Sequence, residues 1–312
     1  MWKLCIWIYF FCIYFGPLKT QKTHIYEKCH PFPDKERRNF TNDDAFFTLH
    51  TRQNREGINI TNTTAYDIPN RKTVLLIPHG HQNTTSYFLN FTDAYLHNKE
   101  INVIQTHTNH IIHQRPRVYV EPLGNRISQL LVFLKNERKI ELGNIHLIGI
   151  GLGSHIAGIA ANTTNVNAGT TSDPKIGRVS ALSPSNTDCY SIRTLRTTDA
   201  LIVDSYESSD KGYKGEIGTI TFYPNGGKVQ HLCPECCTKE AYYCNAIRSV
   251  WLYIYTIGIN IEATICDSYE QFLEMRCSSK HPSFGDAYDG ANRGKAYLWI
   301  YCTGLQKCIS TN

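Results

Sequence analysis

Apolar residues fall in short runs that alternate with longer amphipathic segments along most of the chain. The runs are three to five residues long, which is typical of strands buried on both faces of a parallel sheet. Segment 125–139 instead repeats its apolar residues at helical spacing. The predicted strands are 45–51, 74–77, 102–104, 144–148, 179–182 and 200–203, and the predicted helices are 87–96, 125–139, one opening at 149 and one beginning at 237. This alternation predicts an α/β fold with a mostly parallel central sheet flanked by helices, in a single domain over residues 21–312.

The N-terminal residues have a different pattern. Lys3 precedes twelve apolar and aromatic residues, 4–15. As a helix these would span about 18 Å, which is too short for a hydrocarbon core of about 30 Å. We therefore expect residues 1–20 to be a secretory signal peptide, cleaved between Gly16 and Gln21, and the protein to be extracellular. No later segment is apolar over 18 residues, so we expect no transmembrane anchor.

Glycosylation sequons and cysteines agree with secretion. Asn-x-Ser/Thr sequons occur at Asn39, Asn59, Asn62, Asn83, Asn90 and Asn162. Of the 12 cysteines, two lie in the expected signal peptide, and the remaining even number predicts disulfides in an oxidising compartment. Cys302 and Cys308 are placed to close a small terminal loop. A zinc site in the run 233–237 is the alternative, but no second cysteine pair has zinc spacing.

Charge does not point to a nucleic-acid or anionic-membrane partner. The formal net charge is +5, from 32 Lys and Arg against 27 Asp and Glu, and the excess is spread without a long basic run. This distribution indicates an ordinary solvated surface.

A glycine-rich turn follows the strand predicted at 144–148. It has the sequence Gly149-Ile-Gly151-Leu-Gly153. In α/β hydrolases the nucleophile occupies the centre of a Gly-x-Ser-x-Gly turn between a strand and a helix. The outer glycines are present here, and the centre is Gly151. Glycine tolerates the positive φ of such a turn, so the turn can persist without its serine.

The blocks around this turn resemble the pancreatic-lipase family, and most closely its short insect branch of venom phospholipases. The resemblance runs from about residue 74 to residue 301. The blocks that carry it are Asn144-Ile-His-Leu-Ile-Gly-Ile-Gly-Leu-Gly-Ser-His-Ile-Ala-Gly158, Ile176-Gly-Arg-Val-Ser-Ala-Leu-Ser-Pro184, Thr198-Asp-Ala-Leu-Ile-Val-Asp204 and Phe222-Tyr-Pro-Asn-Gly-Gly-Lys228. The resemblance implies an α/β-hydrolase fold and a carboxylic-ester hydrolase ancestry.

The catalytic positions that the resemblance implies are all substituted. The family's serine falls on Gly151, its aspartate on Ser183 and the histidine of its Cys-Ser-His motif on Lys239. Glycine cannot form an acyl-enzyme, and a protonated lysine is a poor base. The former oxyanion region falls on His81 and Leu152. We therefore expect no catalytic residues and no cofactor.

Two alternatives to a vacant site remain. Ser154 is the nearest hydroxyl and could be a relocated nucleophile, although it lies three positions beyond the turn. His79, His81 and His107 follow neighbouring predicted strands and could bind Zn²⁺ or Cu²⁺, although the chain has 13 histidines in all.

The resemblance also implies disulfides and a lid. It implies a Cys266–Cys277 bridge, and it places the family's lid between Cys233 and Cys237, with only three residues between these disulfide cysteines. The pairing of Cys29, Cys189, Cys236 and Cys244 stays open. No residues follow Asn312 to form the C-terminal β-sandwich of pancreatic lipases, so we expect neither that domain nor a colipase-type partner.

Three functional hypotheses follow. The first is a secreted, catalytically inactive lipase-like protein that binds a lipid or a protein partner. The second is an active ester hydrolase or phospholipase with a relocated nucleophile. The third is a storage or venom-type structural glycoprotein.

Overall fold

The computed structural model describes residues 40–78, 84–108, 116–168, 175–188, 191–213, 215–234, 238–302 and 308–310. The expected signal peptide, the oxyanion residue His81 and the candidate ligand His79 lie outside these residues. So do Cys29, Asn39, Asn83, Cys189, Cys236 and Cys237.

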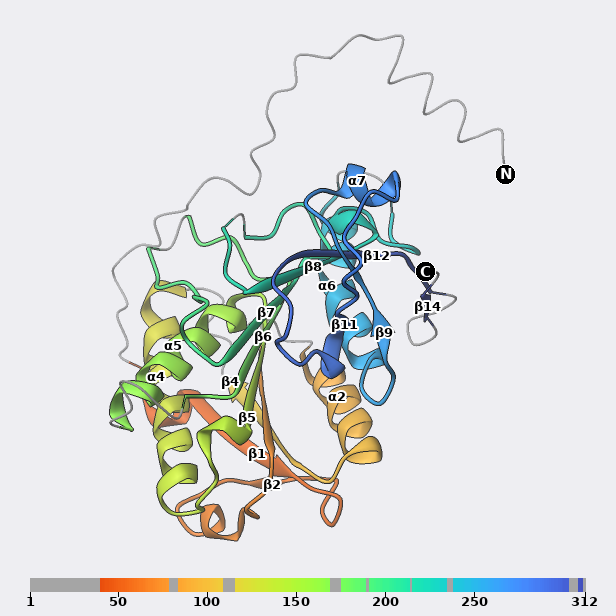
Figure 1. The fold of residues 1–312 in the computed structure, drawn as a ribbon. Helices are drawn as coiled ribbons and strands as arrows, with labels where there is room; N and C mark the ends of the chain where they lie inside the picture. The colour runs from red at the N-terminus through yellow and green to blue at the C-terminus, as the bar shows by residue number, and fades with distance from the viewer. Residues whose placement is uncertain are drawn as a thin grey trace. The chain divides into compact units, whose positions relative to one another are not determined.

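A twisted sheet of 10 strands forms the centre of the described chain (Figure 1). In spatial order its strands are β10 (Thr264–Ile265), β12 (Gly294–Leu298), β8 (Ile220–Pro224), β7 (Ile202–Tyr206), β6 (Arg178–Leu182), β5 (Ile145–Ile150), β3 (Thr73–Ile77), β4 (Asn102–Thr108), β1 (Ala45–His50) and β2 (Ile58–Asn59). The strands from β12 to β4 are mutually parallel, and β1, β2 and β10 are antiparallel to their neighbours. The predicted mostly parallel sheet is confirmed, and the chain has an α/β-hydrolase fold.

Helices cover both faces of this sheet (Figure 1). One face carries α4 (Pro116–Asn136) and α5 (Leu152–Asn167), and the other carries α2 (Thr84–Asn98) and α6 (Lys239–Tyr255). Each helix pair buries its apolar stripe against the nearly continuous apolar strands, which gives two cores separated by the sheet. Among the described helices none is long and apolar enough to cross a bilayer.

Short elements complete the described chain. They are α7 (Tyr269–Leu273), the pair β9 (Ile261–Glu262) and β11 (Ser283–Phe284), the pair β13 (Ile300–Cys302) and β14 (Cys308–Ser310), and the 3₁₀ helices η2 (Asn42–Asp44), η3 (Thr64–Asp67), η4 (Leu142–Asn144), η5 (Asn225–Gly227) and η6 (Gly285–Ala287). Cys302 lies opposite Cys308 in the β13–β14 pair. A bridge between these two cysteines stays a prediction.

Two differences from the predicted elements have local causes. Helix α4 begins at Pro116, nine residues before the expected start, because proline is well suited to the first turn of a helix and the interior Pro122 does not end it. Strands β8 and β12 were not predicted. Strand β8 alternates buried and half-buried positions, and β12 opens on exposed residues, so neither reads as a fully apolar run.

Candidate functional site

Gly151 and Ser183 lie side by side at the carboxyl edge of the sheet. Gly151 directly follows β5 and Ser183 directly follows β6, and the last residues of these two strands are paired in register. The Gly151 N–H donates to the carbonyl oxygen of Leu182 at 2.9 Å. Gly151 has φ 56° and Ser183 has φ 42°, so both residues adopt the left-handed backbone of a tight turn.

The flanking glycines are required by close backbone contacts. A Cβ added to Gly153 would lie 2.4 Å from the carbonyl oxygen of Ile77 and 2.6 Å from that of Pro78. A Cβ added to Gly149 would lie 2.3 Å from the carbonyl oxygen of Gly153. The strand-to-helix turn that the glycine spacing predicted is present, and it packs against the end of β3.

Ser183 contacts α6 through its hydroxyl. Ser183 Oγ donates to the main-chain carbonyl oxygen of Ala246 at 2.7 Å and lies 3.2 Å from Ser208 Oγ. Ser208 is fully buried, donates to the carbonyl oxygen of Asn245 at 2.7 Å and accepts from the N–H of Ser249 at 3.0 Å. Two serine hydroxyls thus hold the middle of α6 against the carboxyl edge of the sheet.

The residue of α6 that contacts Ser183 is Ala246, not Lys239, where the resemblance placed the family's histidine. Lys239 is the first residue of α6, seven positions before Ala246, which is about 10 Å along a helix. The family's histidine follows the second lid cysteine by two positions, and the structure bonds Cys233 to Cys244, not to Cys237. Two positions after Cys244 is Ala246. Cysteines at 233, 236, 237 and 244 lie close together in the sequence, so the pattern alone allows more than one position for this histidine.

The same disulfide changes the expected lid. Cys233 and Cys244 are 11 positions apart, so ten residues lie between them where three were expected. The second described disulfide joins Cys266 to Cys277, the pair that the resemblance implied.

His155 fixes the loop that carries Ser183. It is fully buried on α5, and its Nε2 lies 2.9 Å from the carbonyl oxygen of Ser185, while the N–H of Leu195 donates to its Nδ1 at 3.2 Å. These partners require the neutral ring protonated on Nε2. Burial lowers the pKa of His155, and the hydrogen bond to Ser185 opposes this effect in part.

The side chains considered as a relocated nucleophile or as metal ligands make other contacts. Ser154 is fully buried, and its Oγ donates to the carbonyl oxygen of Gly149 at 2.9 Å. His107 lies 2.8 Å from Thr48 Oγ1 and stacks on Phe46. Within the described part of the chain, no three His, Cys, Asp or Glu side chains are grouped to bind a metal ion.

The sequons within the described residues are accessible to different degrees. Asn59, Asn62 and Asn162 are exposed, whereas Asn90 is half-buried on α2, where its Nδ2 donates to the carbonyl oxygen of Ser86. Glycosylation at these sites stays a prediction.

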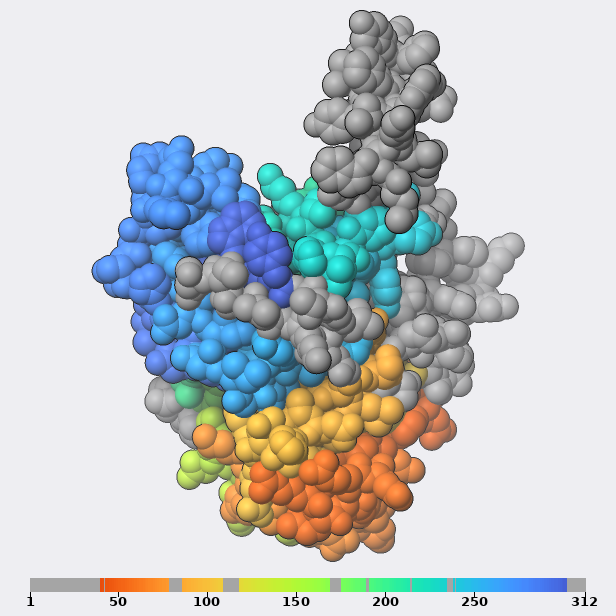
Figure 2. Space-filling model, turned by 90° about the vertical axis from the view of Figure 1, so that its right-hand side faces the viewer, coloured from red at the N-terminus to blue at the C-terminus, as the bar shows by residue number. Residues whose placement is uncertain are grey.

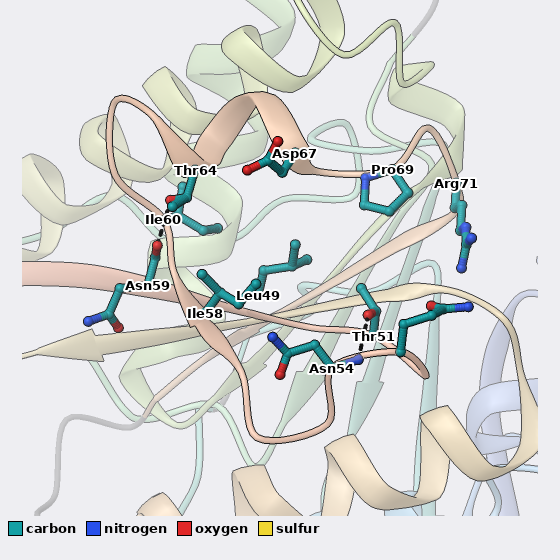
Figure 3. A pocket seen from close by; sticks show the side chains of 11 residues that line it. Leu49, Thr51, Asn54, Ile58, Asn59, Ile60, Thr64, Asp67, Pro69 and Arg71 are labelled. Carbon is teal, nitrogen blue, oxygen red and sulfur yellow. Dashed lines mark hydrogen bonds between the residues drawn. The ribbon is translucent and has the colours of Figure 1, made fainter.

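A cavity of about 430 Å³ lies elsewhere, beside the β1–β2 edge (Figure 3). Leu49, Ile60 and Pro69 supply apolar lining, and Asp67 and Arg71 supply charged groups. Pro69 and Arg71 precede β3, so this cavity lies near the amino ends of the parallel strands, away from Gly151 and Ser183. It is therefore separate from the carboxyl-edge site.

The chain is similar in sequence to known lipases. The protein family described as Lipase matches residues 18–298. Lipase member H of Mus musculus is 30% identical over 308 residues, which cover 89% of this chain and 63% of the relative. Lipase member H of Xenopus tropicalis is 28% identical and covers 81% and 58% of the two chains, and lipoprotein lipase of Rattus norvegicus is 28% identical and covers 52% and 38%. The chain thus spans less than two thirds of the length of these relatives.

A solved lipase/esterase structure from Lactobacillus plantarum aligns with 70% of this chain and 86% of its own, at a TM-score of 0.33 and 9% identity. The strand order and register of the central sheet define its fold.

Proposed function

Because the chain belongs to the lipase family, we propose that it is a secreted member that does not hydrolyse esters and that binds a lipid or a protein partner instead. The observation that carries this proposal is the identity of the three residues gathered at the carboxyl edge: Gly151, Ser183 and Ala246.

None of these residues can perform the steps of ester hydrolysis. Gly151 has no side chain to attack a carbonyl carbon, and the methyl group of Ala246 cannot accept or return a proton. Ser183 carries no charge that would orient and stabilise an imidazolium. In a serine protease, loss of such a triad costs on the order of 10⁶ in rate. The geometry of Ser154 gives no support to a relocated nucleophile, because its hydroxyl is buried and bonded to the helix start.

Secretion is supported by the apolar N-terminal segment, the two disulfides and the exposed sequons. The strand-to-helix turn at Gly151 is intact, so the scaffold around the former catalytic position is available as a binding surface.

The test compares the natural protein with two triple variants. Natural protein, Gly151→Ser/Ser183→Asp/Ala246→His and the matched Gly151→Ser/Ser183→Asp/Lys239→His are assayed on a short-chain ester and on phosphatidylcholine. We expect no turnover by the natural protein, weak turnover by the Ala246→His variant and none by the Lys239→His variant. A fluorophosphonate probe gives a second readout and should label only the Ala246→His variant. Turnover or labelling of the natural protein would overturn the proposal.

A further inference from the structure

An aromatic cluster lies where α7 meets the segment that follows β12. The ring centroids of Tyr269 and Phe272 are 6.1 Å apart, and Trp299 lies 5.8 Å from Tyr269 and 6.0 Å from Phe272. Tyr301 follows Trp299 by two positions, and its ring packs edge-on against His231 with the centroids 5.6 Å apart. Residues 30 positions apart therefore present one group of rings.

Exposed apolar side chains continue this cluster. Leu273 is 49% exposed, Met275 93% and Tyr301 49%. The Cys266–Cys277 disulfide closes the base of the segment that carries α7 and holds it as a lobe (Figure 2, blue, upper left). We call the surface formed by Tyr269, Phe272, Leu273, Met275, Trp299 and Tyr301 the α7 surface. Large apolar side chains that are exposed close to an aromatic cluster are typical of an interaction site.

The α7 surface lies at the same edge of the sheet as Gly151. Trp299 directly follows β12, which runs parallel to β5 and is four strands away from it in the sheet order. At about 4.8 Å per strand, the end of β12 is about 19 Å from the end of β5. A large partner bound to the α7 surface would therefore also lie near the carboxyl edge of the sheet.

The charges around the α7 surface favour a cationic group. Asp267, Glu270 and Glu274 lie on the same segment as a single basic residue, Arg276, which pairs with Glu274. Lys228 is near enough to contribute to the lowered pKa of Glu270, after the hydrogen bonds from the Glu270 main chain and from Ser268. Lys295, whose carbonyl oxygen accepts from the N–H of Cys266, is a further basic residue beside this segment. The excess of carboxylates therefore belongs to the described segment 266–277 itself, where three carboxylates accompany one basic side chain and favour a cationic group.

We propose that the α7 surface docks on the choline head groups of a phosphatidylcholine surface. Quaternary ammonium groups bind to the faces of Trp and Tyr rings. Neighbouring carboxylates attract the same cation at a distance, so they keep their own hydrating water. Leu273 and Met275 then enter the boundary between head groups and acyl chains, where exposed apolar side chains gain from leaving water. The biological use of this docking rests on the lipid-binding part of the proposed function, not on the loss of the triad.

Vesicle flotation of the full-length protein tests the proposal. The probes are vesicles of phosphatidylcholine and vesicles of phosphatidylglycerol. We expect binding to phosphatidylcholine and weaker binding to phosphatidylglycerol. Leu273→Ser/Met275→Ser should weaken binding about tenfold. Tyr301→Leu, which keeps an apolar side chain but removes the ring, should weaken binding to phosphatidylcholine selectively.

Val166→Ser is the matched control, because Val166 is 65% exposed but lies near the C-terminal end of α5, away from the α7 surface. It should leave flotation unchanged, and thermal unfolding checks that each variant folds. The proposal is overturned if the natural protein does not float with phosphatidylcholine, if it prefers phosphatidylglycerol, or if Leu273→Ser/Met275→Ser floats like the natural protein. The last two results would indicate a different lipid contact, and the first would leave a protein as the partner of this surface. Ester turnover is measured separately, so failure of docking and failure of the proposed inactivity are distinguishable.

Discussion

The hydroxyl of Ser183 donates a hydrogen bond to the main-chain carbonyl oxygen of Ala246, 2.7 Å away. This contact joins the end of β6 to the middle of α6, where the acid and base of an active lipase would meet. The contact predicts that substitutions at Ser183 and Ala246 are coupled in their effect on stability, whether or not the protein is catalytic.

Ser183→Asp should destabilise the protein, because its carboxylate would face the carbonyl oxygen that now accepts the hydroxyl proton. Ala246→His should recover part of this loss in the double variant by giving the carboxylate an N–H partner. We expect a coupling energy of about 1 kcal/mol or more in a double-mutant cycle measured by urea unfolding. The cycle with Lys239→His should show no coupling; equal coupling in both cycles would contradict the placement of Ala246.

Gly153→Ala should destabilise the fold by about 2–3 kcal/mol, because the new Cβ would meet the rigid carbonyl oxygens of Ile77 and Pro78. Gly143→Ala is the control, since a Cβ there has no atom within 4 Å. Chemical denaturation of both variants decides the question. If the two variants were equally stable, the close packing of the turn on β3 would be wrong.

Acid should destabilise the protein in part through His155. Burial lowers its pKa in the folded state below the ordinary value of 6.5. Below pH 6.5 the unfolded chain therefore binds a proton that the folded chain does not, so stability is complete above pH 6.5 and is lost as the pH falls. The loss is at most about 1.4 kcal/mol per pH unit, until the folded-state pKa is reached.

His155→Gln keeps a donor and an acceptor but does not titrate. Comparing the unfolding free energy of the two proteins between pH 7 and pH 5 should show a shallower decline for His155→Gln. Parallel declines would mean that His155 titrates alike in the folded and unfolded chains.

Asp204→Asn should cost about 3 kcal/mol or more. Asp204 is fully buried and accepts from Arg178 Nη2 at 2.7 Å and Nε at 3.0 Å, so loss of its charge leaves a buried guanidinium without an anion. Glu100→Gln is the control: its pair with Arg71 is 2.9 Å long, but Glu100 is 55% exposed, so the cost should stay below about 1 kcal/mol. Thermal unfolding of both variants measures the difference, and similar losses would contradict the burial of the Arg178–Asp204 pair.

Proteolytic mapping without reduction should yield peptides that join Cys233 to Cys244. Cys233→Ser and Cys244→Ser should lower stability by the same amount, about 3 kcal/mol from the entropy of an 11-position loop. A Cys233–Cys237 peptide would restore the three-residue lid and the Lys239 position.

The sequence does not decide whether Lys239 or Ala246 occupies the position of the family's histidine. Cysteines at 233, 236, 237 and 244 are close enough in sequence that several pairings are compatible with short loops. Only the 5.6 Å separation of the Cys233 and Cys244 Cα atoms decides between them. Ser208 was not predicted from the sequence for the same reason, because its contact with α6 depends on how β7 and α6 pack.

The sequence alone determined the parallel sheet and the turn at Gly149, Gly151 and Gly153, because apolar periodicity and the backbone freedom of glycine act over a few neighbouring residues. It also determined that Gly151 offers no nucleophile. The tertiary structure decided that Ala246 lies beside Ser183 and that α7 and Trp299 form one aromatic surface. Those relationships join residues tens of positions apart, and they are set by packing across the sheet, which no local pattern encodes.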